Sequence, residues 1–226
     1  MQKKHLLCFL MGLTVSVCGL IAVSLHTVQP AQAAEVKTGT GLAEHVLMAN
    51  DEGWQYQYGC YGQFVGGVRA TDCSGLIKSY FWWTGDKTNP NPGLRSVPAS
   101  SESMFSAASA KGRINLSDPK SLPRVHGLIL YSPGHVGVYV GDNMEVDNRE
   151  SGENILYRSV IGGRYHWQYW LKIPQLKYPT TGFVTFNGDK YYYENGQYVV
   201  STTRTIGGKV YSFDDSGAVV SETSKS

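Results

Sequence analysis

The chain has 226 residues, with 20 Lys+Arg against 18 Asp+Glu and a formal net charge of +2. This near-neutral balance, without a run of basic residues, argues against a nucleic-acid-binding protein. The length suffices for one sizeable domain and a small additional module.

Residues 1–33 have the pattern of a secretory signal peptide. Lys3 and Lys4 form a basic start, an apolar run covers residues 6 to about 28, and Ala31-Gln32-Ala33 supplies a small-x-small cleavage sequence. We expect cleavage after residue 33, which would leave 18 basic against 18 acidic residues once the two lysines are removed. Because the apolar run is longer than usual, an uncleaved anchor helix is the alternative.

After cleavage, Cys60 and Cys73 would be the remaining cysteines of the four. Two cysteines do not make a disulfide framework, and we expect both to be free thiols, with Cys60 as a packing residue. A first amphipathic helix is predicted over Thr38–Asn50 and an aromatic loop over Trp54–Gly59. The glycine-rich run over residues 59–67 predicts a mobile loop at the mouth of a cleft.

Cys73 is expected in the first turn of a helix. Asp72 is a suitable N-cap, and the apolar residues that follow are at helical spacing up to the stop at Gly85. The backbone N–H groups and the dipole at a helix N-terminus favour a thiolate, so the pattern predicts a lowered pKa for this thiol. A buried structural cysteine is the alternative, as for any lone Cys.

A turn over Asn89–Gly93 and a short helix over Ser101–Ala110 are predicted next. Strands follow over Gly127–Ser132, Val136–Val140 and Met144–Asp147, the last two joined by a tight turn. Two further strands are predicted over Asn154–Val160 and His166–Ile173. Helices followed by an antiparallel sheet indicate the α+β class.

His135 lies at the start of one of these strands and Asp147 on the next one. A cysteine at a helix N-terminus, a histidine base on a strand and a polar group that orients the histidine make a Cys-His-X catalytic arrangement. Glu145, on the same strand face as Asp147, is the alternative orienting residue. His126 and His166 are expected to be structural or surface residues.

The two motifs Asp72-Cys73-Ser74-Gly75-Leu76 and His135-Val136-Gly137-Val138-Tyr139-Val140-Gly141 resemble those of the NlpC/p60-type cysteine peptidases of bacterial cell walls. The resemblance covers roughly Leu42 to Ile173 and implies a papain-like fold. It also implies catalytic roles for Cys73, His135 and a third residue twelve positions after the histidine, which is Asp147.

A Y-x-[YW]-G-G segment precedes the cysteine motif in that family, and its first tyrosine donates to the oxyanion. Tyr56 matches that tyrosine by position, and Tyr58 is the next candidate. A wall of the cleft is an equally good interpretation of both.

The remaining chain differs in composition. Residues 177–182 are expected to be a linker between a catalytic domain over 34–176 and β-hairpin repeats over 183–226, because the segment from Phe186 to Gly196 recurs from Ile206 to Gly217. The repeats resemble cell-wall-binding or glucan-binding repeats of Gram-positive surface proteins. This implies wall polysaccharide, glucan or choline as ligand, through four aromatic residues: Tyr191, Tyr193, Tyr211 and Phe213. A remnant without a ligand is the alternative.

The resemblances together imply a secreted peptidoglycan hydrolase, associated with the cell wall of a Gram-positive bacterium, that cuts an amide bond of the stem peptide. The family's usual bond joins D-isoglutamate to the diamino acid. Three alternatives stay open: a non-catalytic wall-binding or adhesive protein, an N-acetylmuramoyl-L-alanine amidase, and a transacylase. We expect a monomer that needs no cofactor or metal.

Overall fold

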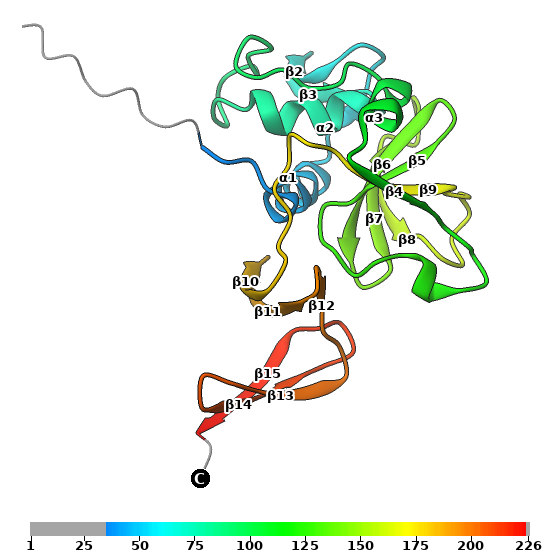
Figure 1. Cartoon of the computed structure of the whole chain (residues 1–226). Helices are drawn as coiled ribbons and strands as arrows, with labels where there is room; N and C mark the ends of the chain where they lie inside the picture. Colours follow the sequence, from blue (N-terminus) through cyan, green and yellow to red (C-terminus); the bar gives the residue numbers. More distant parts are fainter. Residues whose placement is uncertain (1–34, 225–226) are drawn as a thin grey trace, which may run out of the picture. The chain divides into compact units, whose positions relative to one another are not determined.

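The computed structural model describes residues 35–224, so the predicted signal peptide or anchor lies outside the described residues (Figure 1). Three α-helices are described, together with one 3-10 turn at Pro119–Ser121. The helices are α1 (Gly39–Asp51), α2 (Cys73–Trp82) and α3 (Ser101–Ala107). Among these residues, none of the helices is both long and apolar enough to cross a bilayer.

A six-stranded antiparallel sheet in the order β4-β9-β5-β6-β7-β8 packs with these helices. Residues 35–176, which contain both, are called the catalytic part below because the sequence predicts a catalytic domain there. Its strands are β4 (Ala110–Arg113), β5 (Ile129–Ser132), β6 (His135–Gly141), β7 (Met144–Asn148), β8 (Ile155–Ser159) and β9 (Tyr169–Lys172). Helix α1 packs on β6, β7 and β8, and α2 packs on β6 and β7 (Figure 1). The α+β arrangement expected from the sequence is therefore present.

The core between helices and sheet explains why β6 is largely apolar after His135. All seven residues of β6 are buried, since helices cover one face and the rest of the domain the other. Val136 and Val138 are fully buried, as are Leu42 and Val46 of α1. Continuous apolar strands of this kind are typical of sheets with both faces covered.

The glycine-rich segment that was predicted to be a mobile loop is a β-hairpin instead. Strands β2 (Tyr61–Val65) and β3 (Val68–Thr71) pair around Gly66 and Gly67, whose positive φ angles of 61° and 89° suit a tight turn. The short strand β1 (Gln55–Tyr56) pairs with β3 in parallel.

Arg69 fixes this hairpin from inside. Its guanidinium lies 4.2 Å from the ring centre of Phe64 and 4.4 Å from that of Trp83, and its Nη1 donates to the Gly62 carbonyl at 2.7 Å. A buried cation with carbonyl acceptors and aromatic faces holds the hairpin in one conformation.

The predicted helix over Ser101–Ala110 is shorter in the structure, because it ends at Ala107 and β4 follows. Strand β4 pairs with β9 and was not predicted. At Gly112 a Cβ atom would lie 2.7 Å from the indole of Trp170, so glycine lets the strand pass beneath that ring. Nothing in the local alternation of this polar strand indicated it.

The C-terminal segment consists of two three-stranded antiparallel units. The first contains β10 (Gly182–Phe186), β11 (Asp189–Glu194) and β12 (Gln197–Tyr198), and the second contains β13 (Thr202–Ile206), β14 (Lys209–Phe213) and β15 (Val219–Ser224). Hairpins were predicted for both repeats, and each has one strand more than a hairpin.

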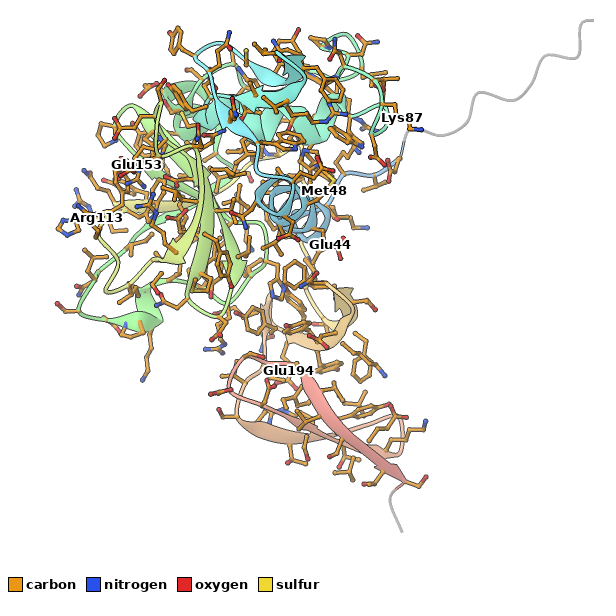
Figure 2. All side chains as sticks on the ribbon, turned by 180° about the vertical axis from the view of Figure 1, so that it is seen from behind. Glu44, Met48, Lys87, Arg113, Glu153 and Glu194 are labelled. Carbon is orange, nitrogen blue, oxygen red and sulfur yellow. The ribbon has the colours of Figure 1, made fainter. Side chains whose placement is uncertain are left out.

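The first unit packs against the catalytic part rather than standing apart from it. The Asn187 amide donates to the Glu44 carboxylate of α1 at 3.1 Å, and the Tyr198 amide donates to the Arg124 carbonyl at 3.0 Å. Figure 2 shows Glu44 on the side of α1 that faces this unit. The boundary at residues 177–182 therefore stays a prediction, while the packing shows that the first unit is joined to the catalytic part.

His126 is the centre of this contact. The imidazole is 1% exposed, stacks on Phe186 at 4.0 Å and on Tyr198 at 4.6 Å between ring centres, and bonds through Nδ1 to the Tyr193 hydroxyl at 2.9 Å. Burial lowers the pKa of His126 to about 3. His126 is thus a structural residue, and it is neutral at physiological pH.

The four aromatic residues that were predicted to bind a cell-wall ligand are all buried. Tyr191, Tyr193, Tyr211 and Phe213 are between 0% and 7% exposed. The two units also contact each other through the Glu194–Arg204 ion pair at 2.9 Å (Glu194 is labelled in Figure 2). Their aromatic faces therefore serve packing within and between the units.

Candidate active site

Cys73 is the first residue of α2, and the chain before it is tightly fixed. Asp72 caps the helix: its Oδ1 accepts from the Gly75 amide at 2.6 Å and from the Ser74 hydroxyl at 3.0 Å, while Oδ2 accepts from the Gly59 amide at 2.9 Å. A Cβ atom at Gly75 would lie 1.9 Å from the Cys60 carbonyl oxygen, so glycine is required there. The DCSG sequence thus sets the position of the sulfur.

The pKa of the Cys73 thiol is raised, contrary to the prediction from its place at a helix N-terminus. Burial is the main cause, and the carboxylates of Asp72 and Asp147 act in the same direction. The backbone N–H groups of Val136 and Ser74 oppose it by stabilising the thiolate, but burial outweighs them. The thiol therefore needs a neighbouring base to become nucleophilic at neutral pH.

His135 and Asp147 lie together, on the adjacent strands β6 and β7. The His135 Nε2 atom is 2.6 Å from Asp147 Oδ2. This contact leaves Nδ1 as the ring nitrogen free to take a proton from a substrate or nucleophile. Although burial raises the pKa of Asp147, the hydrogen bond and charge of His135 and the charge of Arg149 hold it below its usual value.

Glu145, the alternative orienting residue, is on the same strand but not at the histidine. It is fully buried, 3.7 Å from Arg158 Nε, and its two oxygens have no hydrogen-bond partner within residues 35–224. Burial and the neighbouring Asp147 raise its pKa well above the usual value. Burial therefore favours the neutral form of the Glu145 carboxyl, and Asp147 is the carboxylate that contacts His135.

Trp167 supports the histidine ring, and the sequence analysis did not identify it. The indole stacks on His135 with ring centres 5.3 Å apart and planes 16° apart. A Cβ atom at Gly137 would come within 2.8 Å of this indole. The glycine of the His-Val-Gly motif was the one sequence signal for a large ring packed at this point.

Cys73 and His135 line a single cavity of about 400 Å³. Tyr56, Tyr58 and Arg149 line it as well, with Lys78 of α2 and Glu102 of α3. Asn148 joins the two sides of this cavity, because its Nδ2 donates to the Thr71 hydroxyl at 2.7 Å, just before the Cys73 helix.

Tyr56 and Tyr58 differ in their surroundings. The Tyr56 pKa is raised by burial and then by the charges of Cys73 and Asp72, which places its hydroxyl in the field of the nucleophile. Tyr58 is 86% exposed. Of the two, Tyr56 is therefore the less exposed and interacts with the charge of Cys73, and its role as an oxyanion donor stays a prediction.

Two of the other histidines, His126 and His166, and also Cys60 were considered near the site in the sequence. His126 lies at the contact with the first C-terminal unit, and His166 is exposed, with its carbonyl accepting from Ser132. Cys60 is buried, and its thiol and that of Cys73 are both free. Each of the three lies outside the set of residues that line the cavity.

Comparison with known proteins gives partial similarity to two solved structures. One is the peptidoglycan hydrolase RipB from Mycobacterium tuberculosis, with 21% identity and a TM-score of 0.38 over 62% of this chain and 67% of that chain. The other is the P60 domain of a Mycobacterium avium subspecies paratuberculosis antigen, with 21% identity and a TM-score of 0.39 over 62% of this chain and 98% of that chain. No family model and no curated protein matches the chain.

Proposed function

We propose that this protein is a peptidoglycan hydrolase that cleaves an amide bond of the stem peptide with Cys73 as nucleophile. The observation that carries the proposal is one cavity containing the thiol of Cys73 and the ring of His135, with Asp147 held 2.6 Å from His135 Nε2. Nucleophile, base and orienting group are the parts that covalent catalysis by a thiol needs.

In this mechanism His135 takes the thiol proton on Nδ1 as the sulfur attacks the amide carbon. Asp147 stabilises the imidazolium that forms, since its carboxylate is ionised and bonded to Nε2. The backbone N–H of Cys73 and the Tyr56 hydroxyl stabilise the tetrahedral oxyanion. His135 then protonates the leaving amine, and a water molecule, activated by the neutral His135, hydrolyses the thioester.

The raised pKa of Cys73 supports general-base activation in the complex over a thiolate formed in advance. A substrate that fills the cavity removes water from the thiol and the ring, so proton transfer to His135 is coupled to attack.

The bond between D-isoglutamate and the diamino acid is the proposed target, because the two sequence motifs resemble enzymes with that specificity. An N-acetylmuramoyl-L-alanine amidase, a transacylase and a non-catalytic wall-binding protein are the alternatives. Secretion to a Gram-positive cell wall is part of the same proposal. Wall binding by the C-terminal units would use exposed side chains such as Phe183, which is 36% exposed, since the four aromatic residues first considered are buried.

Digestion of purified peptidoglycan, with mass spectrometry of the fragments, tests the proposal. We expect the wild-type protein to release stem-peptide fragments, Cys73→Ala to release none, and Cys60→Ala to keep most of the activity. Cys60 is the matched control because it is a buried free cysteine that does not line the cavity. Equal release by the Cys73 variant would contradict the mechanism. Release of whole stem peptides with a free N-terminal L-alanine, from glycan strands left with a free lactyl carboxylate, would indicate the amidase.

A further inference from the structure

The charged groups of the active-site cavity differ in how much hydrogen-bonding capacity the protein itself uses. Both oxygens of Asp72 accept from the protein, and so do both of Glu102, from the Gly134 amide at 2.8 Å and the Ser101 hydroxyl at 2.7 Å. The two cations that line the cavity, Lys78 and Arg149, keep donors that no protein atom of residues 35–224 accepts. The cavity is therefore better supplied with charged donors than with charged acceptors.

Arg149 has the more defined geometry of the two cations. Its Nε and Nη2 atoms donate to Asp147 Oδ2 at 3.1 and 2.5 Å, and its guanidinium lies 3.9 Å from the ring centre of Tyr165. One edge of the guanidinium is thus bonded to Asp147, and one face is covered by an aromatic ring. These contacts hold a side chain that would otherwise lose considerable rotamer freedom on binding a ligand.

The edge formed by Nη1 and the second N–H of Nη2 makes no hydrogen bond to residues 35–224. A guanidinium has five N–H donors, and two parallel donors on one edge match the two oxygens of a carboxylate. The Arg149 side chain is 17% exposed and lines the cavity that contains Cys73 and His135. Asp147 therefore contacts both the ring of His135 and the guanidinium of Arg149, and both of these side chains line the cavity.

We propose that Arg149 binds a carboxylate of the substrate beside the amide bond that is cut. The inference rests on the proposed function and names the substrate class: stem peptides in which the isoglutamyl residue has a free α-carboxylate rather than a carboxamide. The α-carboxylate belongs to the residue whose side-chain carbonyl forms the amide bond. This carboxylate is close to the reacting carbonyl, so a cation held beside His135 can bind it.

Discrimination between these substrates has a clear physical origin. A carboxylate accepts two charge-assisted hydrogen bonds from the guanidinium, whereas a carboxamide accepts with one oxygen and places an N–H donor against the cation. Charged hydrogen bonds are stronger than neutral ones by an amount that corresponds to about 10- to 100-fold in affinity. We expect this preference for the free acid.

The test measures binding separately from turnover. In the Cys73→Ala background, calorimetry compares two synthetic peptides, L-Ala-γ-D-isoglutamyl-diamino acid and its isoglutamine counterpart. We expect the acid to bind about 10- to 100-fold more tightly than the amide. In the further variant Arg149→Gln the ratio should fall to about 1, and Arg149→Lys should give an intermediate ratio because it keeps the charge but not the fork.

Lys78→Gln is the matched control, because it removes the other cation of the cavity and should leave the ratio of the two affinities unchanged. Equal binding of the two peptides would overturn the inference, and so would a ratio lost in Lys78→Gln but kept in Arg149→Gln. None of these binding outcomes decides whether the wild-type protein hydrolyses peptidoglycan. If the Cys73→Ala variant bound the acid with the expected preference but the wild-type protein hydrolysed no peptidoglycan, the proposed function would be wrong and the carboxylate site would still be supported.

Discussion

The buried His126 makes the contact between the catalytic part and the first C-terminal unit sensitive to acid. Its pKa is about 3 in the folded protein, against 6.5 for an unperturbed histidine. A lowered histidine pKa means that the folded state requires the neutral ring. The stabilisation is complete above pH 6.5 and is lost as the pH falls from 6.5 toward 3.

The size of the effect follows from the two pKa values. At pH 5 the unfolded chain binds almost one proton at this site and the folded chain almost none, which costs about 2 kcal/mol of stability relative to neutral pH. For a chain of this length that is a decrease of about 4–8 °C in the midpoint of thermal unfolding. His45, whose pKa burial also lowers to about 3, makes an equal contribution that is unaffected by changes at His126.

Substitution of His126 by Phe should remove this part of the acid sensitivity. The ring can still stack on Phe186 and Tyr198, and the Tyr193 hydroxyl keeps the backbone N–H of residue 126 at 3.3 Å. Urea denaturation at pH 7.5 and pH 5.0 gives the difference in unfolding free energy for each protein. We expect this difference to be about 2 kcal/mol smaller in His126→Phe than in the wild type.

The exposed His166 provides the control, since His166→Asn should keep the wild-type pH dependence. The comparison uses the change between two pH values within each protein, so a general loss of stability in the variant does not affect it. An unchanged pH dependence in His126→Phe would refute the reasoning, because it would mean that the ring is protonated or exposed in the folded protein.

Three other changes test the site and the fold. Asp147→Asn should lower kcat/KM on soluble muropeptides about 10- to 1000-fold, because the ring keeps a hydrogen-bond partner but loses its counter-charge; a wild-type rate would show that the carboxylate is a simple polar strand residue. Glu145→Gln should gain stability relative to the wild type as the pH rises above 4.5, because the raised pKa of Glu145 in the folded protein makes ionisation favour the unfolded chain. Urea denaturation at several pH values measures this, and parallel pH curves for the two proteins would contradict it. Truncation after Pro179 should lower the midpoint of thermal unfolding by about 5–10 °C, because it removes the aromatic rings that bury His126, and truncation after Ser201 should lower it much less. Equal midpoints for the two truncations in calorimetry would show that the first unit does not stabilise the catalytic part.

Much of the catalytic part could be predicted because its local signals agree with the tertiary fold. Asp72 before an apolar helical pattern predicted α2 and the position of Cys73, and the run after His135 predicted β6 with its turn into β7. Two residues on adjacent strands then had to lie close, as His135 and Asp147 do. Local sequence patterns of this kind determine the secondary structure and turn, and these in turn place the side chains.

Other features depend on partners that are distant in sequence. The hairpin β2–β3 looked like a mobile loop because its glycines favour turns, while its order comes from Arg69 packed between Phe64 and Trp83. The raised pKa of Cys73 results from burial by the rest of the fold, which outweighs the local effect of the helix N-terminus. Trp167 is 32 positions after His135 and stacks on the ring of His135 because the chain returns beside β5, where β9 pairs with it.

The docking of the first C-terminal unit on His126 also bears on how such a protein can be recombined. A binding module that is exchanged between enzymes during evolution or in the laboratory must leave no core residues behind. A junction at Gly182 would leave His126 without the rings of Phe186 and Tyr198. A junction near Ser201 would instead cut between the units, where the half-buried Glu194–Arg204 pair is one of the polar contacts. A chimera built at Ser201 would keep an intact catalytic core and could carry a different number of units.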